Sequence, residues 1–278
     1  MIFHSSLITT HELATALNDN TIVLLDCTID KVGNSIRDEQ LELIPNSLFF
    51  DIEDKLSDKT SKFPHTLVTP EIFEQEMQAL GINQDSTIVL YDRWGIYSSP
   101  RAWWMFKVMG FNRVYILNGG LPAWKEDKFP LANTYADQVV KGNFKANYRE
   151  SWYADKEYIL ENYQNDSIKI FDARSRGRFL GEVPEPRHGL KSGHIPYSKN
   201  IPFEALLNGK FYWDKESLAS IFQIQNPTSD EYIFSCGSGI TASILAFASH
   251  LIGQEKIKVY DGSWSEWGIE ELNLPIAK

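Results

Sequence analysis

The 278-residue sequence contains only two cysteines, Cys27 and Cys236. Two cysteines cannot form a disulfide framework or a Cys-rich zinc site, so we expect neither. No apolar run reaches the roughly 18 residues of a membrane span, and the N-terminus lacks the basic and long apolar regions of a targeting signal. These absences predict a cytoplasmic protein without a membrane partner.

Basic charge and glycine-rich nucleotide motifs are also scarce. The formal net charge of −10 disfavours binding to a phosphate backbone, so we expect no nucleic-acid partner. The segment Gly237-Ser-Gly239 lacks the third glycine of the dinucleotide-binding pattern. The sequence therefore predicts a protein without a bound metal or cofactor.

The second cysteine lies in the most informative stretch of the chain, residues 232–246. An apolar run ends at Cys236, two glycines follow within three residues, and a helical pattern begins at once. Backbone N–H groups in a Gly-containing turn and at a helix N-terminus bind anions, and therefore favour a thiolate. We predict that Cys236 is a nucleophile. Cys27 has no such surroundings and is predicted to be a structural thiol.

A cysteine phosphatase is excluded by the same loop. Such enzymes need an arginine six positions after the nucleophile to grip the phosphoryl oxygens, and that position holds Ala242. No basic residue occurs between Cys236 and Thr241.

The chain contains an internal repeat. The run Ile88–Asp92 and the helical pattern after it parallel residues 232–253, and residues 118–124 parallel 261–267. Strand-like runs alternate with helical patterns in both halves, which predicts an α/β fold of two tandem domains, each a mostly parallel sheet flanked by helices. The predicted organisation is a first domain at 1–135, a linker at 136–152 and a second domain at 153–278.

The repeats differ at the reactive position. Aligning them places Asp92 opposite Cys236, and a carboxylate cannot carry a transferable sulfur. We therefore expect the first domain to be catalytically silent.

The loop after Cys236 and three other motifs of the chain resemble those of a known family. The loop Cys236-Gly-Ser-Gly-Ile-Thr-Ala resembles that of the two-domain rhodanese-type sulfurtransferases, most closely the 3-mercaptopyruvate sulfurtransferases. Further matching signatures are Asp172-Ala-Arg174, Gly193-His-Ile-Pro196 and Tyr260-Asp-Gly-Ser-Trp264. The resemblance implies two rhodanese-like domains and transfer of a sulfane sulfur from 3-mercaptopyruvate through a Cys236 persulfide.

The resemblance also implies roles for loop residues and for an acceptor. The backbone N–H groups of the loop would hold the anionic sulfur and the substrate; these residues are Gly237, Gly239, Ile240 and Thr241. Arg178 and Arg187 match the positions that hold the carboxylate and carbonyl of mercaptopyruvate. The implied acceptor is a thiol such as thioredoxin or a small thiol, or cyanide.

His65 matches a position that related enzymes use in a proton-handling triad. The partners here would be Ser238 and an upstream acid, Asp54, and the spacing leaves Glu53 and Asp51 open as alternatives. Such a relay is chemically reasonable because the departing enolate must acquire a proton.

Other polar residues of the second half are predicted to be structural. Residues 174–189 are expected to form a loop, in which Arg174 pairs with an acidic partner. His194 is expected to satisfy backbone groups.

Two alternative functions remain open. The first is thiosulfate:cyanide sulfurtransfer, which the uncharged pair Gly237-Ser238 disfavours because thiosulfate carries two negative charges. The second is a non-enzymatic sulfur carrier or redox module, which is disfavoured by the presence of two substrate-binding arginines, Arg178 and Arg187.

Overall fold

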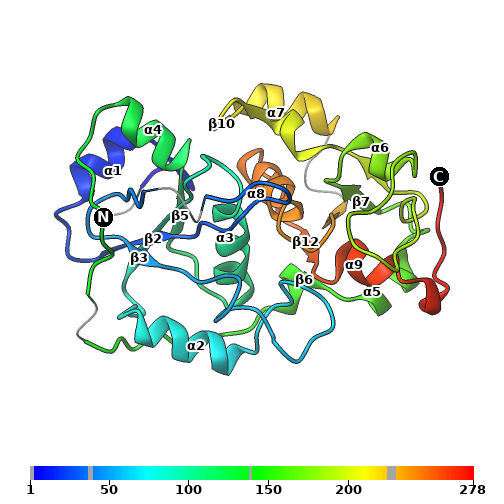
Figure 1. The fold of residues 1–278 in the computed structure, drawn as a ribbon, viewed down its shortest axis with the longest axis horizontal. Coiled ribbons are helices and arrows are strands. Elements are labelled where there is room, and N and C mark those ends of the chain that lie inside the picture. The colour runs from blue at the N-terminus through cyan, green and yellow to red at the C-terminus, as the bar shows by residue number, and fades with distance from the viewer. Residues whose placement is uncertain (1–2, 37–39, 138–139, 224–229) are drawn as a thin grey trace. The chain divides into compact units, whose positions relative to one another are not determined.

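The computed structural model describes residues 3–36, 40–137, 140–223 and 230–278 (Figure 1). These residues form two compact units. The first comprises residues 1–57, 68–148 and 209–212, and the second comprises 58–67, 149–208 and 213–278. The main division, after Tyr148, falls inside the segment predicted as the linker, and each unit also includes a short segment from the other half of the sequence.

The first unit is built on a five-stranded sheet with the order β1-β5-β4-β2-β3. Every neighbouring pair is parallel. The strands are β1 (Leu7–Ile8), β2 (Ile22–Asp26), β3 (Leu48–Phe49), β4 (Thr87–Tyr91) and β5 (Val114–Leu117). The two central strands consist almost entirely of β-branched and leucine residues, as expected for strands covered on both faces.

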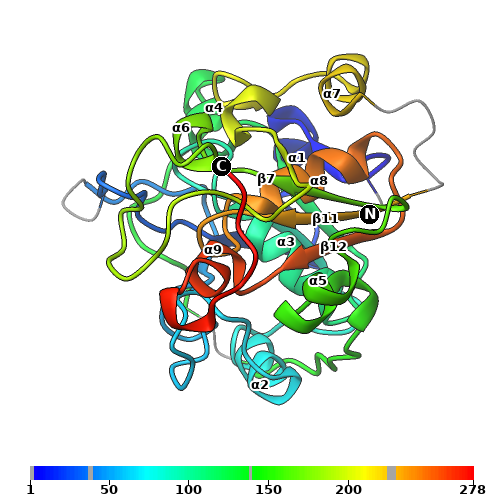
Figure 2. The same cartoon turned by 90° about the vertical axis from the view of Figure 1, so that its right-hand side faces the viewer.

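The second unit repeats this topology. Its strands are β6 (Tyr153–Ala154), β7 (Ile168–Asp172), β8 (Lys199–Asn200), β11 (Glu231–Ser235) and β12 (Ile257–Tyr260). Their order, β6-β12-β11-β7-β8, is that of the first sheet strand for strand, and all four pairs are again parallel. Figure 2 shows β12, β11 and β7 of this sheet side by side. The predicted fold class of two α/β repeats is confirmed.

Helices connect the strands, and several begin at side-chain caps. Thr9 forms a capping box with Glu12, and Asp155 and Asp214 each accept a hydrogen bond from a backbone N–H of the first turn. In the first unit the helices are α1 (Thr10–Ala16), α2 (Pro70–Ala79), α3 (Ser99–Val108) and α4 (Gly120–Glu126). In the second they are α5 (Lys156–Asn162), α6 (Arg176–Phe179), α7 (Lys215–Phe222), α8 (Ala242–Leu251) and α9 (Ser263–Trp267).

Short elements complete the chain. The 3₁₀ helices are η1 (Glu150–Trp152), η2 (Phe203–Leu206) and η3 (Glu270–Leu272), and the two-residue strands are β9 (Leu207–Asn208) and β10 (Phe211–Tyr212).

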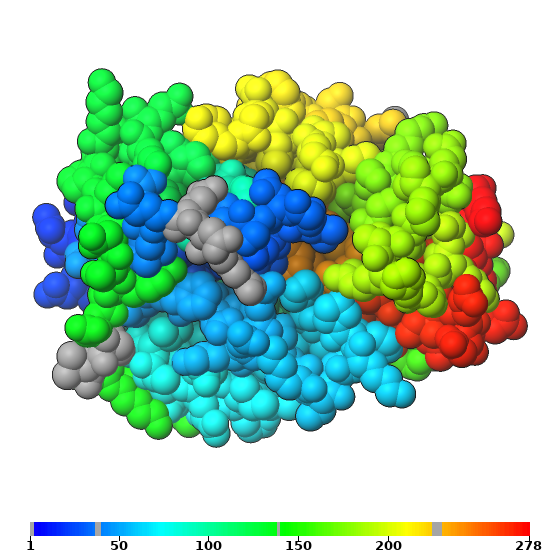
Figure 3. Space-filling view, in the orientation of Figure 1, coloured from blue at the N-terminus to red at the C-terminus, as the bar shows by residue number. Residues whose placement is uncertain are grey.

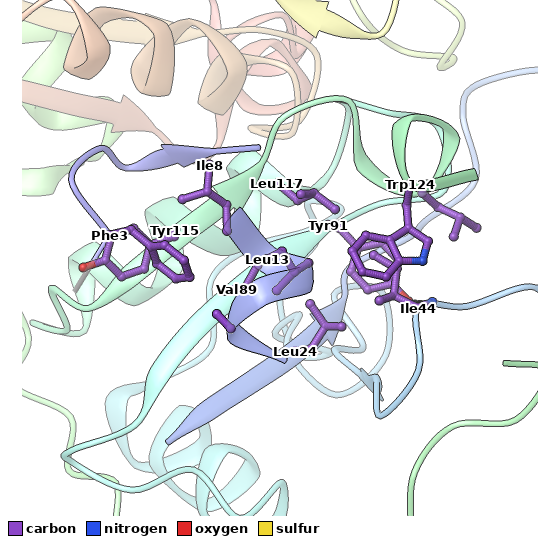
Figure 4. Packing of buried hydrophobic residues seen from close by; sticks show 12 residues of the cluster. Phe3, Ile8, Leu13, Leu24, Ile44, Val89, Tyr91, Tyr115, Leu117 and Trp124 are labelled. Atoms are coloured by element: carbon purple, nitrogen blue, oxygen red, sulfur yellow. Dashed lines mark hydrogen bonds between the residues drawn. The ribbon is translucent and has the colours of Figure 1, made fainter. Parts of the chain in front are cut away.

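Each unit has its own hydrophobic core. In the first, Leu13 of α1 and Trp124 of α4 pack with Leu24 and Val89 of the central strands (Figure 4). In the second, Ile170 and Ile233 of the central strands pack with further apolar residues, among them Ile159, Tyr260, Trp264 and Trp267. Burying a side chain of this size stabilises the fold by about 1.5–3 kcal/mol. The cores thus hold the carboxyl ends of the strands in place.

The expectation that residues 174–189 form only a loop is wrong for their first part. Residues Arg176–Phe179 form the single helical turn α6. Phe179 is buried, and its ring stacks on His194 with 3.7 Å between the ring centroids. This burial stabilises a turn for which the polar sequence gave no periodic signal. Most of residues 182–189 are exposed and lie on the yellow-green surface in Figure 3.

Candidate active site

Cys236 follows directly after β11, and Asp172 ends the neighbouring strand β7. The chain continues from β7 to β8 on one side of this pair and from β11 to β12 on the other, so the pair is the switch point of the sheet. Open parallel sheets bind ligands outside the carboxyl ends of their strands at such a point. Cys236, of which 2% is exposed, lies at that place.

The loop after Cys236 presents backbone N–H groups to the sulfur. The N–H of Gly239 donates to Sγ of Cys236 over 3.1 Å. Gly239 has φ +81°, a left-handed conformation that glycine adopts at little cost. In the described part of the chain, no acceptor is found for five further N–H groups, those of Gly237, Ser238, Ile240, Thr241 and Ala242. These donors precede or begin α8, whose N-terminus carries partial positive charge, so together they form an anion-binding cradle.

The start of α9 holds this loop through hydrogen bonds to the loop backbone. Oγ of Ser263 accepts a hydrogen bond from N–H of Cys236 over 3.2 Å and donates to the carbonyl of Tyr260 over 2.8 Å. The N–H groups of Trp264 and Ser265 donate to the carbonyls of Cys236 and Gly237 over 3.0 and 2.9 Å. These bonds fix the position of the cysteine backbone.

Sequence reasoning missed Ser263. It has φ +49°, close to the +51° of Gly120 at the matching place of the first repeat. A serine in this conformation is strained, and its hydroxyl supplies the bond to Cys236 that a glycine would lack. The alignment of the two repeats could have pointed to this residue, because it places Ser263 opposite Gly120.

The matching loop of the first unit already contains an anion. Asp92 is completely buried. Its Oδ2 accepts hydrogen bonds from the N–H groups of Tyr97, Ser98 and Ser99 over 2.9–3.0 Å and from Oγ of Ser99 over 2.8 Å. Its Oδ1 accepts a further bond from N–H of Trp94 over 3.1 Å. The first repeat thus fills its own cradle with a side chain, whereas the second leaves its cradle open.

Two arginines lie beside the open cradle. A Cβ atom placed on Gly237 would lie 3.2 Å from Nη2 of Arg178 and 3.7 Å from Nη1 of Arg187. Gly237 therefore allows both guanidinium groups to approach the loop directly after the cysteine. The structure brings the two arginines named from the sequence together at Cys236.

A buried carboxylate, Glu185, connects the arginines of this region. It accepts hydrogen bonds from Nε and Nη2 of Arg178 over 3.2 and 2.5 Å, and from Nη1 of Arg174 over 2.8 Å. Arg174 also pairs with Asp172 over 2.6 Å and lies over the ring of Trp264. The predicted acidic partner of Arg174 is confirmed. Glu185 was not singled out from the sequence; its only signal was its position between two prolines in an arginine-rich segment.

His65 lies in the segment 58–67, which belongs to the second unit. Its Nδ1 and Oγ of Ser238 share a hydrogen bond of 3.0 Å, whose donor depends on the imidazole tautomer. His65 has φ +60°, an unfavourable conformation for this residue. Two residues later, N–H of Leu67 donates to Oδ2 of Asp261 over 2.8 Å, which anchors the segment. The structure therefore joins His65 to the loop serine named from the sequence.

The acid proposed to partner His65 lies in the first unit. There, Oδ1 of Asp51 accepts a hydrogen bond from N–H of Asp54 over 2.8 Å. The pairing of His65 with Asp54, or with the alternatives Asp51 and Glu53, stays a prediction.

The remaining candidates are structural. Cys27 is completely buried, and burial together with the nearby Asp26 and Asp92 raises the pKa of its thiol well above the usual value. A neutral thiol is a poor nucleophile, which supports the structural interpretation. Nδ1 of His194 lies 2.8 Å from the carbonyl of Phe179, in agreement with its expected contact with the backbone.

Metal and membrane features are not found within the described ranges. Among those residues, no group of three or more His, Cys, Asp or Glu side chains could hold a metal ion. No helix in the same residues is long and apolar enough to cross a membrane.

Fold and site together define a class: a duplicated parallel α/β protein with a cysteine-containing anion cradle in one copy only. The model of the rhodanese-like domain matches residues 9–127 and 155–270. The chain therefore belongs to the rhodanese family and contains two rhodanese-like domains.

Individual relatives cover most of the chain. The 3-mercaptopyruvate sulfurtransferase of Escherichia coli strain K12 is 38% identical over 270 residues, 95% of each chain. A thiosulfate sulfurtransferase of Cricetulus griseus is 38% identical over 229 residues, 81% of this chain and 76% of the relative. Among solved structures, SseA from Escherichia coli superimposes with a TM-score of 0.83 at 34% identity, covering 94% of this chain and 100% of SseA.

Proposed function

We propose that the protein is a 3-mercaptopyruvate sulfurtransferase. The observation that carries this proposal is the open cradle, in which N–H of Gly239 contacts Sγ of Cys236 while two guanidinium groups approach Gly237. The similarity to a 3-mercaptopyruvate sulfurtransferase over 95% of the chain supports the choice of donor.

In the first step, the thiolate of Cys236 attacks the sulfur of 3-mercaptopyruvate. A new S–S bond forms while the bond between that sulfur and carbon 3 breaks, and its electron pair leaves on the carbon as the enolate of pyruvate. Protonation of the enolate carbon releases pyruvate. The enzyme is left with one additional sulfur on Cys236.

The first repeat supplies an internal analogue of this persulfide. A carboxylate oxygen of Asp92 and the outer sulfur of a cysteine persulfide are each separated from Cβ by one atom, and both carry negative charge. Oδ2 of Asp92 accepts from the N–H groups at positions 97–99, and Oδ1 accepts from the N–H at position 94. Because α3 begins at Ser99 and α8 begins at Ala242, positions 97–99 correspond to 240–242. We therefore assign the open N–H groups of Ile240, Thr241 and Ala242 to the outer sulfur, which they would stabilise electrostatically.

The two arginines would bind the 2-oxo acid end of the donor. A guanidinium group matches a carboxylate with two parallel N–H donors, and this geometry directs the thiol of the substrate toward the cradle. The proximity of Arg178 and Arg187 to Gly237 supports this role.

The hydrogen bond between His65 and Ser238 would handle the proton. Ser238 lies in the loop of the nucleophile, so its hydroxyl would protonate the leaving carbon, and His65 would replace the proton that the hydroxyl gives up. Asp54 is proposed as the acid that orients His65, with Asp51 and Glu53 as alternatives.

In the second step, an acceptor thiolate attacks the outer sulfur and Cys236 leaves as a thiolate. Thioredoxin, a small thiol or cyanide as the acceptor, and a cytoplasmic location, stay predictions.

The test combines a variant with mass spectrometry. After incubation with 3-mercaptopyruvate, the wild-type protein should gain one sulfur atom on Cys236, and Cys236→Ser should gain none and lose sulfur transfer while retaining its circular dichroism spectrum. The additional sulfur on Cys27 instead would refute the assignment. Rates with 3-mercaptopyruvate and thiosulfate, measured side by side, decide between the two donors.

A further inference from the structure

Glu185 is a buried carboxylate that contacts a proposed substrate arginine. Its side chain is 2% exposed, although it lies in a segment whose other residues are mostly exposed. Burying a carboxylate is costly unless it is paired, and Glu185 is paired on both oxygens, with Arg174 and with Arg178.

This contact limits what Arg178 can offer a ligand. Nε and Nη2 form a parallel pair of bonds to Glu185, so Nη1 is the guanidinium nitrogen without an acceptor in the described part of the chain. Arg187, by contrast, has no acidic partner within the same residues. One arginine is thus neutralised and held in a fixed orientation, and the other keeps its full charge for the ligand.

The charged side chains of the arginine cluster, which consists of three arginines and two carboxylates, sum to one positive charge. The cations are Arg174, Arg178 and Arg187, and the carboxylates are Asp172 and Glu185. Both kinds of donor meet the same Cys236 thiolate, so the charge that distinguishes them is that of the arginine cluster. One net positive charge in this cluster suits a ligand with one negative charge, such as a 2-oxo acid, better than a dianion such as thiosulfate.

We propose that Glu185 determines the charge of the accepted sulfur donor, because it neutralises Arg178 and orients its guanidinium group. This inference rests on the proposed function, since it assigns the arginines to the donor. Glu185 is a positioning residue that acts through Arg178 and does not itself contact the donor. The residue selects monoanionic donors against dianionic ones.

The decisive variant is Glu185→Gln, which keeps the size of the side chain and an acceptor oxygen but removes the charge. Without the charge of Glu185, the guanidinium group of Arg178 attracts a dianion more strongly than a monoanion. The difference is the interaction of one additional pair of charges a few ångströms apart. The ratio of kcat/KM for thiosulfate to kcat/KM for 3-mercaptopyruvate should therefore rise on the order of ten-fold. For 3-mercaptopyruvate the change should be mainly in KM. Inhibition should move in parallel, with sulfate binding tighter relative to pyruvate.

Glu182→Gln is the matched control, because it removes the same charge from an exposed side chain three residues away. Its donor ratio should stay within about two-fold of the wild type. Equal loss of both activities in Glu185→Gln, or an equal rise of the ratio in both variants, would overturn the proposal.

A second variant covers the case in which the buried Gln is not tolerated. Glu185→Asp keeps the charge but moves it away from Arg178, so the ratio should rise by a smaller factor, about two- to three-fold. An unchanged ratio in this variant would overturn the proposal. Failure of the proposed function is seen separately, because the wild type itself would then not use 3-mercaptopyruvate.

Discussion

Replacing Asp92 by alanine should strongly destabilise the first repeat without changing the chemistry of the second. The carboxylate is fully buried and accepts five hydrogen bonds, four from backbone N–H groups and one from the hydroxyl of Ser99. Each buried donor left without an acceptor costs about 1–3 kcal/mol. The five donors share two oxygens, and water that enters the vacated space will satisfy some of them. We therefore expect a loss of about 3–4 kcal/mol, a large part of the 5–15 kcal/mol that stabilises a typical domain.

The matched control is Asp92→Asn. Its amide oxygen can replace Oδ2, which accepts four of the five bonds, while the amide nitrogen faces the single donor at Trp94. The loss should therefore be smaller, about 1–2 kcal/mol. Urea unfolding followed by fluorescence measures both values, and a two-domain chain requires that each transition be fitted separately.

The rate of sulfur transfer is the second measurement on Asp92→Ala. Because Cys236 and its cradle lie in the other unit, the rate of sulfur transfer per folded Asp92→Ala molecule should equal that of the wild type. A loss of stability below about 1 kcal/mol would show that the buried donors find other acceptors. A stable but inactive variant would show that the first repeat takes part in the reaction.

Two further predictions concern the proton relay and the buried acid of the first sheet. Ser238→Ala removes the partner of His65 and should lower kcat with 3-mercaptopyruvate by about 10- to 100-fold. The kcat with thiosulfate should change little, because the leaving sulfite needs no proton. Equal losses with both donors in steady-state assays would contradict the relay. Burial raises the pKa of Asp26 despite its hydrogen bonds with Thr28 and Tyr135. The folded state therefore binds this proton more tightly than the unfolded state, and the resulting stability is present below pH ~4 and lost as pH rises through the folded-state pKa. Asp26→Asn should thus gain stability relative to the wild type as pH rises above ~4, measured by urea midpoints. The opposite trend would show that the charged form is the better stabilised one.

Local patterns in the sequence were sufficient to predict the fold. The apolar runs that end at Asp92 and at Cys236 were expected as strands and are β4 and β11. Such runs are recognisable because a parallel strand covered on both faces must be apolar along its length. The duplication was equally visible, since both copies keep the same order of strands and loops. Cys236 was identified because its cradle is made by consecutive residues, and a continuous segment carries its geometry in its own sequence.

Local patterns did not predict which distant residues meet. His65 and Ser238, 173 positions apart, were paired beforehand only through the family resemblance, and the contacts of Glu185 with Arg174 and Arg178 came only from the tertiary structure. The single turn of α6 likewise depends on the burial of Phe179 against His194. Side-chain contacts of this kind are selected by packing across the folded chain, because no local rule of propensity or spacing determines where a flexible segment will be anchored. The sequence therefore determined the fold, its duplication and the nucleophile, whereas the tertiary structure determined how the surrounding charges are paired.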